Sequence, residues 1–153
     1  MGKTKYELDE LFLNGETPTI EEIKGLTNGR VLAGILPLAN KYIRYIINLP
    51  FILPWKGKFF DPITKDMGKG KNRIEYGLLK IKLFNFETNI IDPLVGDNKV
   101  FSLNYDLSGN PWFIRQIRDD MKKISKKLYL GTANFKWRGE HKFVLYFALE
   151  LAS

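Results

Sequence analysis

The candidate site of this chain consists of tyrosine, arginine and asparagine residues, with aspartates as possible catalytic bases. The chain has 153 residues, no cysteine and one histidine, His141. Without cysteine there can be no disulfide, Cys-zinc site, iron–sulfur cluster or thiol nucleophile. A single histidine is too few for an ordinary transition-metal site. We therefore expect no metal and no cofactor.

Polar side chains at predicted strand positions, or on the inward edge of a predicted helix, make up the candidate site. Burying such groups unpaired is costly. They therefore either pair with each other, as Arg115 and Asp119 could on one helix face, or orient the polar end of a ligand. Both interpretations stay open. The candidate ligand-binding residues are Asn72, Arg73, Tyr105, Arg115, Arg118 and Tyr129.

An enzymatic alternative can be written for the same residues. Isomerase or hydratase chemistry needs a base and an acid, and Asp106 or Asp119 as base with Tyr129 as acid is the combination that the sequence offers. Whichever aspartate is the base would need a raised pKa inside a pocket. We assign no catalytic residue and rank this alternative second.

Positive charge is concentrated in two runs of the chain. The formal net charge is +7, and basic residues cluster between Lys56 and Lys82 and again between Arg115 and Lys127. Such runs attract phosphates when they form one face, so single-stranded nucleic-acid binding is a further alternative. A solvated lysine-rich surface explains the same runs, and we do not favour nucleic acid as a partner.

The N-terminal segment, residues 1–24, predicts helical structure. Thr4 and Glu7 have the spacing of a capping box, and a second pair of the same kind, Thr19 and Glu22, opens a short turn. No apolar signal region is present at the start of the chain, so we expect an unexported, cytoplasmic protein.

An apolar segment follows from Pro37 to Trp55. Residues 37–55 contain an isoleucine stripe with few charges, which predicts a short helix and loop that covers one end of the fold as a lid. The competing interpretation is that Leu38–Trp55 lies on a membrane surface.

The rest of the chain reads mainly as strands. Alternating apolar and polar residues are typical of half-buried strands, and a change of parity at Phe84 and Phe86 indicates a bulge. Gly68 and Gly70 indicate a loop. The predicted strands are Gly29–Leu36, Lys56–Phe60, Leu79–Leu83, Val100–Leu107, Leu128–Trp137 and Lys142–Leu151.

One helix is predicted before the last two strands. Asn110 is a favourable cap, Pro111 suits the first helical position, and Ile114, Ile117 and Met121 then recur at helical spacing.

Several short motifs resemble a known group of domains. Gly25-x-x-x-Gly29-Arg30, then Trp55-Lys56-Gly57-Lys58-x-Phe60 and Gly70-x-Asn72-Arg73, resemble the lipocalin-like domains with a Gly-x-Trp-x-Gly signature, although Thr27 stands where that signature has its tryptophan. The stretches 110–119 and 128–131 look like a pattern in uncharacterised bacterial proteins. The resemblance implies a calycin-type barrel and no particular reaction.

These observations together predict one domain, residues 1–153, of mainly β class. We expect a small antiparallel lipocalin-like barrel with N-terminal helices, a lid helix and one helix before the last two strands. Its expected partner is a small hydrophobic or amphipathic ligand in an apolar cavity of about 300–1,000 Å³. The sequence does not indicate the oligomeric state.

Overall fold

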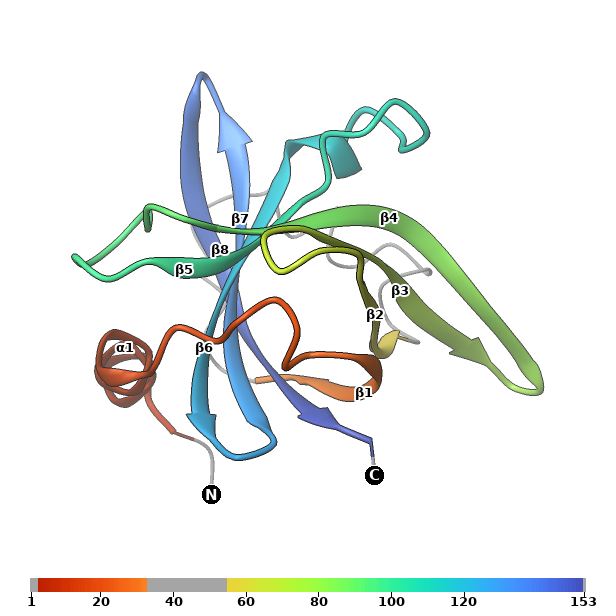
Figure 1. The fold of residues 1–153 in the computed structure, drawn as a ribbon. Coiled ribbons are helices and arrows are strands. Elements are labelled where there is room, and N and C mark those ends of the chain that lie inside the picture. Colours follow the sequence, from red (N-terminus) through yellow and green to blue (C-terminus); the bar gives the residue numbers. More distant parts are fainter. Residues whose placement is uncertain (1–2, 33–54, 153) are drawn as a thin grey trace.

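Eight antiparallel strands form a closed barrel in the computed structural model, which describes residues 3–32 and 55–152. Each strand pairs with the next, and β1 also pairs with β8, which closes the sheet (Figure 1). Closure of a sheet removes the free edge strands that an open sheet has. The strands are β1 (Gly25–Val31), β2 (Trp55–Pro62), β3 (Gly68–Tyr76), β4 (Leu79–Ile91), β5 (Val100–Asn104), β6 (Ile117–Ser125), β7 (Leu128–Trp137) and β8 (Glu140–Leu151).

Helix α1 (Lys5–Asn14) lies outside the barrel beside β6 (Figure 1). The predicted capping box is confirmed: the Thr4 hydroxyl accepts from the Glu7 backbone N–H at 3.2 Å, and the Glu7 carboxylate accepts from the Thr4 N–H at 2.7 Å. The apolar stripe of the helix buries Leu8 and Phe12 in a cluster with Leu130 and other residues of the barrel's outer face.

The segment between α1 and β1 forms a turn rather than a second helix. Glu22 accepts from the Thr19 backbone N–H at 3.0 Å, as the second box predicts. The turn places Ile20 and Ile23, each 1% exposed, in the same core cluster as residues inside the barrel, such as Leu149. The plural N-terminal helices of the prediction are therefore reduced to α1 within the described residues.

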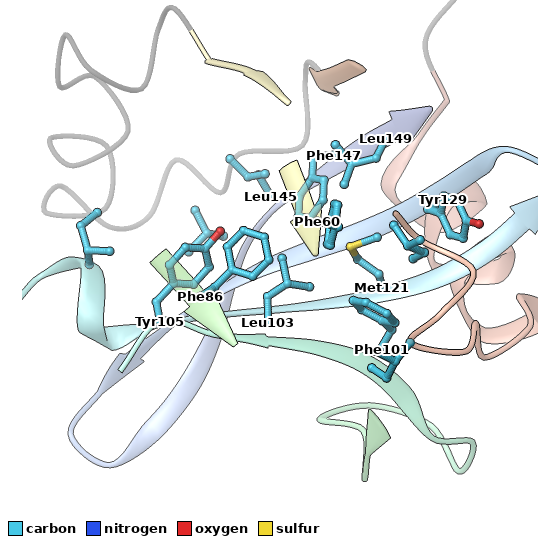
Figure 2. Packing of buried hydrophobic residues seen from close by; sticks show 14 of the residues in the cluster. Phe60, Phe86, Phe101, Leu103, Tyr105, Met121, Tyr129, Leu145, Phe147 and Leu149 are labelled. Carbon is cyan, nitrogen blue, oxygen red and sulfur yellow. The ribbon is translucent and has the colours of Figure 1, made fainter. Parts of the chain in front are cut away.

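The barrel interior is filled mainly by aromatic and aliphatic side chains (Figure 2). Phe60 contacts Phe86 and Phe101 with ring centroids 5.3 and 6.0 Å apart, in the edge-to-face geometry that aromatic pairs favour. Tyr105 and Tyr129 lie at opposite ends of the labelled cluster in Figure 2. The two hydroxyls therefore belong to two different parts of the interior.

The predicted helix after Asn110 is wrong. Only the short 3-10 helix η1 (Ile114–Gln116) forms, and the chain then continues as the strand β6. Pro111 does begin a turn, because its carbonyl accepts from the N–H groups of Ile114 and Arg115. From Ile117 onward the residues alternate between the two faces of the sheet, which places Asp119 on the inward face beside hydrophobic neighbours.

Other boundaries also differ from the sequence predictions. Gly68 and Gly70 lie within β3 rather than in a loop, and β1 begins at Gly25, before the predicted Gly29. The bulge near Phe84 is confirmed, since Phe84 is skipped in the register between β3 and β4 and has a φ of 59°. The strand at 128–137 is confirmed with the predicted bounds.

The predicted lid, residues 37–55, falls outside the described residues except for Trp55, which is the first residue of β2. The membrane-surface interpretation of the same segment also falls outside them. Within the described ranges, no helix is long and apolar enough to cross a membrane.

Candidate functional site

A buried polar cluster lies inside the barrel, surrounded by the hydrophobic core. We call it the inner cluster and define it as Lys58, Asn72, Tyr105 and Asp119. Lys58 and Asp119 form an ion pair of 3.0 Å, with side chains only 4% and 5% exposed. Buried charges of this kind are rare in proteins unless they are paired.

The four members come from strands that are far apart in the sequence. Lys58 on β2 is directly paired with Asn72 on β3. Tyr105 follows β5, and Asp119 on β6 is paired with Leu103 of β5. The cluster therefore exists only once the barrel has closed.

The backbone of Lys58 is held by the neighbouring strand. Thr27 is fully buried, and its hydroxyl donates to the Lys58 carbonyl at 2.8 Å and accepts from the Lys58 N–H at 3.0 Å. Thr27 therefore fixes the position of the strand that carries the buried lysine.

Four aromatic rings surround the Lys58 ammonium. Its Nζ lies 5.2–5.5 Å from the ring centroids of Trp55, Phe86, Tyr105 and Phe147. At this range, the negative faces of aromatic rings attract a cation. The rings shield the ion pair from water while partly compensating the loss of hydration.

Glycines on adjacent strands allow two of these rings to approach. A Cβ on Gly29 would lie 2.5 Å from the Trp55 ring, and a Cβ on Gly131 would lie 2.2 Å from the Phe147 ring. Any larger residue at these positions would push the rings away. The rings also contact each other edge to face, with centroids 5.8 Å apart.

Burial dominates the electrostatics of the inner cluster. Loss of hydration lowers the pKa of Lys58 against the opposing effect of the Asp119 charge. Loss of hydration likewise raises the pKa of Asp119, although Lys58 opposes it. The pKa of Tyr105 is raised well above its ordinary value by burial and by the Asp119 charge. All three groups are thus biased toward their neutral forms.

A cavity adjoins the cluster. Its volume is about 140 Å³, and most of its lining is apolar, contributed for example by Ile74, Ile117, Ala133 and Leu145. The polar lining is provided by the inner cluster together with Asn134. This cavity is smaller than the range expected from the sequence, but an apolar cavity of about 150 Å³ is large enough for benzene.

The structure brings together only part of the predicted site. Asn72 and Tyr105 are members of the inner cluster. Tyr129 lies elsewhere, with its hydroxyl 3.3 Å from Glu22. Arg73 donates to the Thr27 carbonyl and pairs with Glu75.

The two arginines of β6 and the preceding turn pair with carboxylates outside the cluster. Arg115 bonds Asp106 at 2.8 Å, so the predicted pairing of Arg115 with Asp119 is wrong. A strand rather than a helix runs through this region, and the spacing that would have joined them is lost. Arg118 makes two bonds to Asp120, at 2.8 and 3.1 Å.

Lys58 was missed as a site residue, and Asp119 was considered only as a base or as a partner of Arg115. For Asp119 a signal was available in the strand period, because Asp119 shares its face with Ile117 and Met121. A charged residue between two inward hydrophobic residues indicates a buried charge. Lys58 shares its face with Phe60, but Lys56, two residues earlier, is exposed, so the alternation gives no such signal there.

The basic residues of the two runs lie in different environments in the fold. Lys58 lies inside the barrel, and Arg73, Arg115, Arg118 and Lys123 each pair with a carboxylate. Their charge is therefore partly neutralised within the protein. Salt-dependent binding to single-stranded DNA or RNA is still the test of the nucleic-acid alternative.

The fold and the site define an eight-stranded antiparallel barrel with a charged cluster beside an interior cavity. No family model matches the chain, and no curated protein matches it. Among solved structures, a protein from Thermomonospora curvata is similar, with a TM-score of 0.58 and 14% identity, over 99% of this chain and 90% of that one. This similarity concerns the fold.

Proposed function

We propose that the barrel binds a small, mainly apolar molecule in the cavity beside the inner cluster. The observation that carries the proposal is the combination of an apolar lining with one group of buried polar side chains. Binding sites for small molecules are typically built in this way, with few polar groups that orient the ligand. The resemblance to lipocalin-like domains supports the same proposal.

The cavity volume restricts the ligand to a compact molecule. About 140 Å³ accommodates a single six-membered ring and few substituents. The proposal therefore concerns the small end of the predicted range of hydrophobic ligands.

Toluene binding, followed by chemical-shift changes of backbone amides, tests this function. We expect saturable shifts at residues around the cavity, and we expect Ala133→Leu to abolish them, because the larger side chain fills the cavity. Ala152→Leu makes the same change at an exposed position and is the matched control. Equal binding by Ala133→Leu and the native protein would place the ligand elsewhere.

Proton-transfer catalysis is the second candidate, and one observation favours it. Asp119 lines the cavity beside Tyr105, with the Tyr105 hydroxyl 3.3 Å from a carboxylate oxygen. Asp106 is exposed and paired with Arg115, so it is no longer a candidate for the base. Proton exchange next to the carbonyl of small ketones in D2O tests the candidate. Exchange that persists in Asp119→Asn would reject Asp119 as the base.

A further inference from the structure

The hydrogen-bonding capacity of the Lys58 ammonium is fully used within the protein. An ammonium group has three N–H donors and no acceptor. Those of Lys58 are directed to Asn72 Oδ1 at 2.8 Å, the Tyr105 hydroxyl at 2.5 Å and Asp119 Oδ2 at 3.0 Å. Lys58 therefore has no donor left for a ligand.

The other donors of the cluster are also engaged. The Asn72 amide N–H donates to the Tyr105 hydroxyl at 2.9 Å, and the Trp55 indole donates to Asn72 Oδ1 at 3.0 Å. The Tyr105 hydroxyl accepts from Lys58 and Asn72, so its own proton is directed to Asp119 Oδ2. These groups form a closed network around one carboxylate oxygen.

One polar atom of the cluster is left over. Asp119 Oδ1 is buried and has no hydrogen-bond partner within residues 3–32 and 55–152, whereas Asp119 Oδ2 has two. The residue is 3% exposed and lines the cavity. An unsatisfied buried acceptor is costly, and more so when it belongs to a charged group. A molecule in the cavity that donates to this oxygen would remove the cost.

We propose that the ligand of this cavity is a neutral, ring-sized molecule whose hydroxyl group donates a hydrogen bond to Asp119 Oδ1. This inference rests on the proposed binding function and names the ligand class. The free atom is an acceptor, so a ketone or an ether finds no partner. A carboxylate would face the negative oxygen directly. A cation would disturb a cluster whose Lys58 and Asp119 charges already balance.

Phenol and toluene are the matched probes, because they share a ring and have the same number of non-hydrogen atoms. Their dissociation constants are measured for the native protein and for the double variant Lys58→Met/Asp119→Leu. Replacing a buried ion pair by apolar residues of similar volume is commonly tolerated. In this variant Asn72 keeps its bonds to Tyr105 and Trp55.

We expect the native protein to bind phenol more tightly than toluene, although toluene is the more apolar of the two. In the double variant the preference reverses, and the ratio of the two constants changes at least tenfold, which corresponds to about 1.4 kcal/mol. The native protein alone also decides the question, so the result does not depend on the folding of the variant.

The outcomes separate the two proposals. Toluene binding that equals or exceeds phenol binding in the native protein overturns the hydroxyl inference and leaves the binding function standing. An unchanged ratio in a folded double variant overturns it as well. Failure of both probes to bind the native protein rejects the binding function itself, and the inference with it.

Discussion

Two groups that each combine a lysine, an acidic residue and a tyrosine lie at different places in this barrel. The inner cluster contains Lys58, Asp119 and Tyr105. A second group, which we call the end cluster, contains Lys123, Glu22 and Tyr129, with a Lys123–Glu22 distance of 3.1 Å. In each group, the tyrosine hydroxyl lies 3.3 Å from a carboxylate oxygen.

The two groups differ in their exposure to solvent. The lysine and carboxylate side chains of the inner cluster are 4% and 5% exposed, whereas both of those in the end cluster are 27% exposed. The carboxylate pKa shifts accordingly have opposite signs. Burial raises the pKa of Asp119. Partial burial also acts to raise that of Glu22, but hydrogen bonds from Thr19 and Lys123, together with the Lys123 charge, lower it overall.

The comparison shows that residue type alone does not assign a function to a lysine–carboxylate–tyrosine group. In the end cluster, polar atoms without a protein partner can be solvated by water. The group also links the turn at 20–23 to the barrel. In the inner cluster, water is excluded and Asp119 Oδ1 remains unpaired beside a cavity. Only the second arrangement offers binding energy to a ligand.

The largest effect is expected when one partner of the inner ion pair is removed. Asp119→Leu leaves the Lys58 ammonium buried and unpaired, and we expect the free energy of unfolding to fall by about 3–5 kcal/mol. Urea denaturation measures it. Lys58→Met/Asp119→Leu is the control and should recover most of the loss. A double variant as unstable as Asp119→Leu would contradict the account.

A smaller loss is expected when the aromatic rings around Lys58 are displaced. Gly131→Ala places a Cβ 2.2 Å from the Phe147 ring, and such overpacking costs about 1–3 kcal/mol. Gly109→Ala is the control, because its Cβ would meet no atom within 4 Å. Thermal unfolding of the two variants provides the measurement. Equal melting temperatures would show that the rings can move freely.

Breaking the end cluster should have a still smaller effect. Glu22→Gln removes a partly exposed ion pair with Lys123, and such pairs contribute about 0.2–1 kcal/mol. The same urea experiment at neutral pH applies. A loss comparable to that of Asp119→Leu would remove the contrast between the two clusters.

The pH dependence of stability sharpens the contrast through its sign. The lowered pKa of Glu22 gives stability above its unfolded pKa, and this is lost as the pH falls through the folded pKa. The native protein should therefore lose its advantage over Glu22→Gln on acidification below about pH 5. Denaturation of both proteins between neutral and acid pH measures this difference.

Asp119 should behave in the opposite way. Its raised folded pKa means that the folded state binds the proton more readily than the unfolded state. Its contribution is therefore present below the unfolded pKa and is lost as the pH rises through the folded pKa. Relative to Lys58→Met/Asp119→Leu, the native protein should gain stability on acidification. If the stability difference between the native protein and the variant changed in the same direction on acidification for both clusters, this prediction would be wrong.

The barrel class was predictable, because most strands follow the period of two. The final hairpin shows this well: β7 has the predicted bounds, and inward residues such as Leu145, Phe147 and Leu149 recur at every second position of β8. The capping box of α1 was equally predictable, because its contacts lie within four residues of sequence. Local rules suffice for both features.

The site was only partly predictable, and the failure has a physical cause. In β6, Asp119 occupies an inward position between Ile117 and Met121, which hides the strand period and leaves a spacing that mimics a helix. In β2, Lys56 and Lys58 alternate as they would on a solvated face, and the register shift between Trp55 and Gly57 hides that Lys58 lies inside. The alternation of apolar and polar residues is interrupted where a charged residue is buried, and the two buried charges belong to the candidate site.

The most direct test of the account is the pKa of Asp119, measured by 13C NMR of the aspartate carboxyl groups with and without phenol. In the free protein, we expect this pKa to lie above the ordinary value for aspartate, because the carboxylate is buried. A hydroxyl that donates to Oδ1 stabilises the charged form, so saturation with phenol should lower the pKa of Asp119, while toluene should not. A pKa of Asp119 that is unchanged by bound phenol would contradict the central claim.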